Sequence, residues 1–146
     1  MAYFYVEPDK KKVDWKKFEN DAAEVFEAFD YEVNRDVRFK TTRRFQIDFI
    51  ASNEKRIFFI DCKDHSYIPP EKEYEFAKMQ LLRAKNFKKL KTDSNQKNII
   101  MLVTKYKTNS LLMHKAGIGS ILSVDYESLP ELLRNIHLYE DELFTF

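Results

Sequence analysis

The stretch Arg56–Ser66, RIFFIDCKDHS, sets an apolar run directly against charged residues. Its four apolar residues, Ile57–Ile60, have the composition of a buried strand. Asp61 and Lys63 follow at once, and a buried strand carries such groups only where it reaches solvent or a functional site. The stretch therefore predicts a strand over Ile57–Lys63 and leaves two alternatives for its end: a surface ion pair or a site.

The two faces of this strand and of the one before it decide which alternative is favoured. Side chains alternate between the faces of a strand. The preceding strand is predicted at Arg44–Ala51, with Phe45, Ile47 and Phe49 on one face and Gln46 and Asp48 on the other. If the two strands form a hairpin, Asp48 lies beside Asp61 and Lys63 on a common face. Two carboxylates and an ammonium group then converge.

This trio of side chains has a chemical use. Two carboxylates hold a hard divalent cation through oxygen ligands and leave positions open for water and substrate. The cation lowers the pKa of a bound water and stabilises charge on a phosphodiester, and Lys63 can orient the water or neutralise the developing charge. The backbone carbonyl of Cys62 is placed as a further ligand, while its side chain is expected in the core. We expect Mg²⁺, with Mn²⁺ able to substitute, and no small-molecule cofactor.

The tripeptide acid–any–lysine is weak as a motif by itself. It occurs three times, at Asp9–Lys11, Asp14–Lys16 and Asp61–Lys63. The first is expected in a polar loop, Glu7–Lys12, and the second at a helix start. Only the third ends an apolar strand that follows another strand carrying an acid, so context gives it meaning.

The remaining pattern predicts one α/β domain over residues 1–146, with a strand or arm in 1–13 (Ala2–Val6) and an apolar tail over 137–146. Helices are expected at Asp14–Phe29, Glu71–Leu90, Asn109–Ala116 and Ser128–Ile136. Strands are expected at Tyr31–Phe39, Arg44–Ala51, Ile57–Lys63, Asn98–Thr104 and Gly119–Val124. The order αβββαβαβα favours a central mixed β-sheet with helices on both faces.

Composition excludes several classes of function. Only two glycines are present, so glycine-rich phosphate loops are absent. The single cysteine excludes a disulfide framework within one chain. No basic segment precedes the apolar start, and no apolar run is long enough to cross a membrane. We expect a soluble, intracellular, cytoplasmic protein that does not contact a membrane.

With these residues in place, the chain resembles the PD-(D/E)XK nuclease superfamily, which has the restriction-endonuclease-like fold. Its pattern is most similar to Mrr-type restriction endonucleases and archaeal Holliday junction resolvases. The resemblance covers about Trp15 to Ile136. The matching pieces are FENDAAEVFEAFDYEV (Phe18–Val33), QIDFIA (Gln46–Ala51), FFIDCK (Phe58–Lys63), NIIMLVTKYKTNS (Asn98–Ser110) and GIGSILSV (Gly117–Val124).

The resemblance implies metal-dependent cleavage of DNA phosphodiesters. It assigns Asp48 and Asp61 as the two acids of the motif, Lys63 as its lysine and Glu19 as the added glutamate of the first helix; Gln80 resembles a glutamine often found in the following helix. The chain departs from the family pattern at three positions: Ile47 replaces a proline, Asp61 a glutamate and Asp30 a glycine.

The helical wheel supports Glu19 independently. At about 100° per residue, Glu19 lies about 70° from the centre of the apolar face, and Glu24 about 150° away, facing solvent. Alternatives stay open for each candidate: Glu19 as an ordinary acid at the helix margin, Asp48 as a solvated acid near a turn, and Gln46 as a polar residue of a sheet face.

Net charge is only +1, but two segments are locally basic: Asn34–Phe45 and Arg83–Lys97. Such runs are either solvated faces or phosphate-binding surfaces. The candidate nucleic-acid contacts are Lys40, Arg43, Arg44, Gln46, Gln80, Arg83, Lys85, Lys88 and Lys89. His65 is either a base or DNA contact or an ordinary loop residue.

The sequence thus favours a Mg²⁺-dependent DNA endonuclease acting on branched (Holliday junction) or duplex DNA. DNA is the expected partner, and a homodimer is expected from the resemblance and the apolar termini. Two alternatives remain: a catalytically inactive DNA-binding module of the same fold, and a protein-interaction or dimerisation domain.

Overall fold

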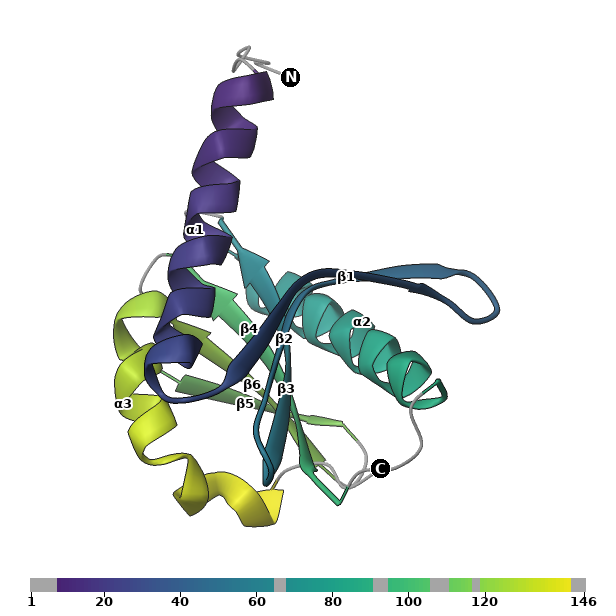
Figure 1. Ribbon diagram of the computed structural model, residues 1–146, viewed down its shortest axis with the longest axis vertical. Coiled ribbons are helices and arrows are strands. Elements are labelled where there is room, and N and C mark those ends of the chain that lie inside the picture. Colours follow the sequence, from purple (N-terminus) through teal and green to yellow (C-terminus); the bar gives the residue numbers. More distant parts are fainter. Residues whose placement is uncertain (1–7, 65–67, 91–94, 106–110, 117–118, 143–146) are drawn as a thin grey trace.

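The computed structural model describes residues 8–64, 68–90, 95–105, 111–116 and 119–142 (Figure 1). In chain order the elements are α1 (Pro8–Ala28), β1 (Glu32–Lys40), β2 (Arg44–Ser52), β3 (Arg56–Lys63), α2 (Pro70–Lys88), β4 (Lys97–Thr104), β5 (Leu111–Ala116), β6 (Gly119–Asp125), η1 (Tyr126–Ser128), α3 (Leu129–Arg134) and η2 (Ile136–Glu142). The labels η1 and η2 denote 3₁₀ helices.

The strands form one mixed sheet in the order β1-β2-β3-β4-β6-β5. Strands β1, β2 and β3 are antiparallel neighbours, β3, β4 and β6 run parallel, and β5 is antiparallel to β6 at the edge. Helix α2 is the crossover between the parallel strands β3 and β4, as a parallel pair requires. The expected mixed sheet with helices on both faces is confirmed, and it is compatible with a restriction-endonuclease-like fold.

Each face of the sheet has its own apolar core. One core lies under α1 and α3, where Phe26 meets Phe49 and Phe58 edge to face. The other lies under α2, where Phe87 packs against Phe59. Strands β3 and β4 are buried on both sides, which explains their continuous apolar runs. In Figure 1, α1 and α3 lie to the left of the sheet and α2 to the right.

The helix expected at Asn109–Ala116 is wrong in its described part, because Leu111–Ala116 is strand β5. It pairs with β6 in register from Leu111 opposite Val124 to Ala116 opposite Gly119. A short apolar run does not distinguish helix from strand. The edge of β6 decides between the two, because its backbone N–H and C=O groups need partners that a neighbouring strand supplies and a helix does not.

The beginning of α1 also differs from the expectation. The helix starts at Pro8, so Asp9 and Asp14 lie inside it, and neither the polar loop over residues 8–12 nor Asp14 as the capping residue is correct. Proline fits the first turn of a helix, where its missing N–H is not needed. In Figure 1 the first turns of α1 project beyond the sheet. The strand or arm expected at Ala2–Val6 lies outside the described residues.

Helix η2 packs back onto the start of β3. The Arg56 guanidinium pairs with the carboxylate of Glu140 in η2, with Nε 2.8 Å from Oε1. The described part of the expected tail is thus a 3₁₀ helix, and residues 143–146 lie outside the description. Across the described segments, none of the helices has the length and apolar character needed to cross a membrane.

Helix α1 ends in a Schellman motif that explains the departure at Asp30. The Tyr31 N–H donates to the Phe26 carbonyl at 3.1 Å, the Asp30 N–H donates to the Glu27 carbonyl at 3.0 Å, and the rings of Phe26 and Tyr31 are in contact. Asp30 has φ 66°, the left-handed conformation that favours glycine at this position.

Replacing Asp30 by glycine is therefore expected to raise the free energy of unfolding by about 1 kcal/mol, because glycine adopts positive φ without a Cβ clash. Urea denaturation of the purified variant measures this change. Asp30→Ala is the matched control and should be less stable than the wild type. Equal stabilities of the glycine and alanine variants would contradict the strain at Asp30.

Candidate active site

The site lies where β2 and β3 separate. The last residues that pair between them are Phe49 and Ile60, so Asp48 and Asp61 stand just beyond the regular ladder. There the Cys62 backbone N–H donates to Asp48 Oδ2 at 2.7 Å. A side chain of β2 thus replaces the backbone partner that β3 loses, and this bond fixes the Asp48 carboxylate at the end of β3.

A change of direction in the β1–β2 hairpin explains why the ladder ends there. Ile47 packs in the core under α2, whereas Phe49 packs in the core under α1. The expectation that these two share a face with Phe45 is therefore wrong. Across from this point, Asp36 has φ 50°, which interrupts the regular pleat of β1. Figure 1 shows the hairpin bending away from the sheet.

The alternation predicted for β3 is confirmed by its packing. Ile57 and Phe59 belong to the core under α2, and Phe58, Ile60 and Cys62 belong to the core under α1. The Cys62 thiol is buried, and desolvation raises its pKa well above the ordinary value, so it stays neutral. A buried neutral thiol is a core group rather than a nucleophile.

Three carboxylates gather at this point from three elements: Glu19 of α1, Asp48 of β2 and Asp61 of β3. Burial, and then the nearby Asp61 and Glu19 carboxylates, together raise the pKa of Asp48 to about 8, against the opposing hydrogen bond from the Cys62 N–H. Burial also raises the pKa of Glu19, with Lys16 opposing the shift. Glu19 is 6% exposed whereas Glu24 faces solvent, as the helical wheel predicts.

Two cations, Lys63 and Arg83, lie beside Asp61 of this acid cluster (Glu19, Asp48 and Asp61). The Lys63 ammonium lies 3.2 Å from Asp61 Oδ2 and 4.0 Å from the centre of the Phe76 ring. The Arg83 guanidinium lies 3.8 Å from the same oxygen and donates to Gln80 Oε1 at 3.1 Å. Asp61 thus has two cationic neighbours, one from its own strand and one from α2.

Helix spacing explains how α2 supplies these neighbours. Phe76, Gln80 and Arg83 are four and three residues apart, so they lie on one face of the helix. Gln80 is fully buried, and its Nε2 finds no hydrogen-bond partner among the residues that the structure describes. Sequence reasoning placed Gln80 and Arg83 among the phosphate contacts and missed Phe76; the spacing of the three residues is the signal that relates them to one site.

The acid cluster has features that suit a divalent cation. Among the described residues, Glu19 Oε2 and Asp61 Oδ2 are buried oxygens that accept no hydrogen bond of regular geometry, although Lys16 Nζ lies 3.8 Å from the first and Lys63 Nζ 3.2 Å from the second. Crowded buried carboxylates are costly unless a positive charge compensates them. In the part of the chain that the structure describes, however, no group of three or more His, Cys, Asp or Glu side chains already surrounds a point that could hold a metal ion. The oxygens suit the ion, and their side chains would have to turn toward it.

The other predicted nucleic-acid contacts lie on the strands of the β1–β2 hairpin, at its turn and at the far end of α2. Lys40, Arg44 and Gln46 are exposed on the hairpin. The Arg43 guanidinium packs over the Phe45 ring at 4.8 Å and contacts Met79 Sδ. The others are at the far end of α2, where Lys85 and Lys89 are exposed and Lys88 is partly buried. His65 lies outside the described residues.

A comparison with protein families agrees with a nuclease-like domain. A family model described as the nuclease-related domain, NERD, matches residues 14–118. One similar solved structure, described as a crystal structure of the protein of unknown function AF1548, is 16% identical with a TM-score of 0.47. The match covers 63% of this chain and 49% of that chain, so this chain spans about half its length. No curated protein matches.

Proposed function

This chain belongs to the nuclease-related domain (NERD) family, and from this membership and its acid cluster we propose that it is a Mg²⁺-dependent DNA endonuclease. The observation that carries the proposal is the meeting of Glu19, Asp48 and Asp61 beside Lys63 at the end of β3. The finer relationship, to the PD-(D/E)XK superfamily and its Mrr-type and Holliday junction members, is part of this proposal.

Asp48 and Asp61 would hold the Mg²⁺, with Glu19 and the Cys62 carbonyl as further oxygen donors. Their fit rests on the raised pKa of Asp48 and on the crowding of three carboxylates at one buried point, because a divalent cation would relieve both. When bound, the ion supplies Lewis-acid stabilisation of charge on a phosphodiester. Mn²⁺ prefers similar oxygen ligands and would substitute.

Lys63 has the position of an electrostatic stabiliser. Its ammonium group is held between Asp61 and the Phe76 ring, so its position is fixed before a substrate arrives. Preorganised charges stabilise a transition state more than mobile ones, because they need no reorientation during the reaction. In the proposed reaction Lys63 donates to a phosphate oxygen or to the attacking water.

Arg83 adds a second positive charge at the same carboxylate. Because Gln80 accepts a hydrogen bond from its guanidinium, Arg83 is directed toward Asp61 rather than along the helix surface. We propose that it holds Asp61 in position and supports the negative charge of the scissile phosphate.

A cleavage panel tests the proposal. Linear, supercoiled, single-stranded and branched DNA are incubated with the protein in Mg²⁺, in Mn²⁺ or in EDTA. The expected result is cleavage of at least one DNA form with either metal and none in EDTA. Asp61→Asn protein purified in parallel controls for contaminating nucleases. Binding of DNA without cleavage of any form would overturn the proposal of an enzyme and would favour the alternative of a DNA-binding module.

The same panel addresses assembly. A protein that acts as the expected homodimer is predicted to cut both strands of supercoiled DNA in one encounter, giving linear product early. A single active centre instead accumulates nicked circles first. The time course on a gel, together with the mass measured by light scattering, distinguishes the two.

A further inference from the structure

The β1–β2 arm, defined as residues 37–47, stands out from the sheet beside α2 (Figure 1). Its inner face is apolar: Val37, Phe39 and Ile47 pack in the core under α2. Its turn is also tied down, because the Thr41 hydroxyl donates to Asn86 Oδ1 of α2 at 2.7 Å. The arm is therefore held in one position by the fold.

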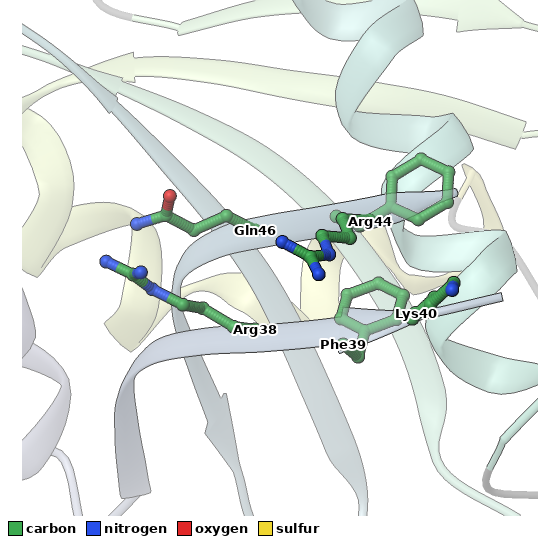
Figure 2. Close-up of a pocket in the computed structure, with 6 residues that line it drawn as sticks. Arg38, Phe39, Lys40, Arg44 and Gln46 are labelled. Carbon is green, nitrogen blue, oxygen red and sulfur yellow. The ribbon is translucent and has the colours of Figure 1, made fainter.

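The outer face of the arm is cationic. Arg38 is paired with Gln46, and Lys40 with Arg44, on adjacent strands, and all four side chains are exposed. Facing residues of an antiparallel pair lie on the same side. Figure 2 shows Arg38 and Gln46 extending in the same direction from neighbouring strands. These residues border an open hollow of about 560 Å³.

Within the described segments, only one of the three cations on this face has an ion-pair partner. Arg38 contacts Asp36, with Nε 3.1 Å from Oδ1. Lys40 and Arg44 have no ion-pair partner among the residues that the structure describes. Like charges directly opposite each other on a hairpin are destabilising. A surface that retains them is suited to a polyanion, whose binding would relieve the repulsion.

The arm is not arranged to read bases. The Gln46 amide donates to Asp36 Oδ1 at 2.7 Å, and Arg38 contacts the same oxygen, so the amide of Gln46 is already engaged. The rings of Phe39 and Phe45 stack on one another at 5.4 Å, and Phe39 also packs against Phe87. Proteins that bind single strands stack bases on aromatic rings, and these rings are committed to the arm.

We infer that the outer face of the β1–β2 arm, through Lys40 and Arg44, binds the phosphate backbone of duplex DNA without reading its sequence. The inference rests on the proposed function, since it supplies the contact that positions the substrate. Arg44 lies on the same strand as Asp48, and four residues of extended chain span at most about 14 Å. A duplex on the arm would therefore reach the acid cluster.

The double variant Lys40→Gln/Arg44→Gln tests the inference. Binding of a fluorescein-labelled duplex is measured by fluorescence anisotropy in EDTA, at salt concentrations from about 50 to 200 mM. Each lost phosphate contact should make the negative slope of log K against log salt shallower by about 0.9. The double variant, which loses two contacts, should therefore have a slope shallower than the wild type's by about 2. The loss should be the same for two unrelated duplex sequences, and the wild type should bind the duplex more tightly than either single strand.

Lys55→Gln/Arg134→Gln is the matched control, because it removes an exposed lysine of the β2–β3 turn and an exposed arginine of α3, neither of which is a predicted nucleic-acid contact. It should keep the wild-type salt slope. Thermal unfolding of the arm variant should show a Tm no lower than that of the wild type, since its changed residues are exposed and repel each other.

The outcomes separate this inference from the proposed function. An unchanged salt slope in the arm variant, a loss of slope confined to the control variant, or tighter binding of single strands would each overturn the arm as a duplex site, even if the wild type cleaves DNA. Loss of slope in the arm variant supports the arm even if the cleavage panel is negative, in which case only the enzyme proposal fails.

Discussion

Asp48→Asn protein is expected to lose cleavage activity by a factor of about 10³ or more while becoming more stable at pH 8 than the wild type without metal. The loss follows because asparagine supplies no negative charge to a divalent cation. The amide oxygen of the introduced asparagine can still accept the hydrogen bond from the Cys62 N–H, which is 2.7 Å from Asp48 Oδ2 in the wild type. The variant should therefore keep the local fold.

The gain in stability follows from the raised pKa of Asp48. Its folded-state pKa of about 8 exceeds the ordinary 3.8, mainly because of burial and then the Asp61 carboxylate. The folded protein therefore binds the proton more tightly than the unfolded chain. This contribution is fully present below about pH 4 and is lost as the pH rises toward and through 8. Each unit of pKa corresponds to about 1.4 kcal/mol, so a gain of at least about 1 kcal/mol is expected at pH 8.

Urea denaturation at pH 5 and pH 8 in EDTA measures this effect, and the cleavage panel measures the activity. The wild type should lose stability between these pH values, and Asp48→Asn should lose less. Mg²⁺ should stabilise the wild type at pH 8, because a ligand that binds only the folded state stabilises it. Glu24→Gln, which changes an exposed acid of α1, is the control for surface charge. Wild-type cleavage by Asp48→Asn would rule out the assigned site.

Lys63→Met protein is the second variant with a large expected effect. Methionine keeps an unbranched chain that can pack against Phe76 but removes the charge 3.2 Å from Asp61 Oδ2. We expect kcat to fall by a factor of about 10² to 10³ with a much smaller change in KM, as for the loss of one preorganised stabilising group. Steady-state kinetics on the preferred DNA form measures both values.

A metal titration separates this role from a structural one. Mn²⁺ binding to Lys63→Met, followed by calorimetry, should be as tight as in the wild type or tighter, because a cation next to Asp61 has been removed. Lys78→Met is the matched control, since Lys78 is an exposed lysine that lies over the Tyr74 ring on the same helix as Phe76. A fall in metal affinity equal to the fall in rate would show that Lys63 acts only by holding the site together.

Much of the site could be predicted from local periodicity. The apolar run and alternation of β3 correctly predicted that Asp61 and Lys63 share the face toward α2, where they contact Arg83 and Phe76, and that Cys62 lies in the core under α1. The helical wheel correctly predicted that Glu19 is buried and that Glu24 is exposed. These predictions succeed because burial on one face of a helix or strand imposes a period of 3.6 or 2 on the sequence itself.

The same local patterns failed where a neighbouring element decided the outcome. Strand β5 forms because β6 offers an open edge, and α1 extends back to Pro8 although its first turns carry no apolar period. The break in the pleat at Asp36 also had no signal, since aspartate is only one of several residues that tolerate positive φ.

The sequence by itself determined the strand that ends in Asp61-Cys62-Lys63, the helix that carries Glu19, and the mixed sheet that relates them. Only the tertiary structure placed the Asp48 carboxylate on the Cys62 N–H, Arg83 beside Asp61, and the cations of the β1–β2 arm on one outer face. The physical reason is that these contacts depend on how strands bend apart and how α2 docks, and such long-range geometry leaves no period in the sequence.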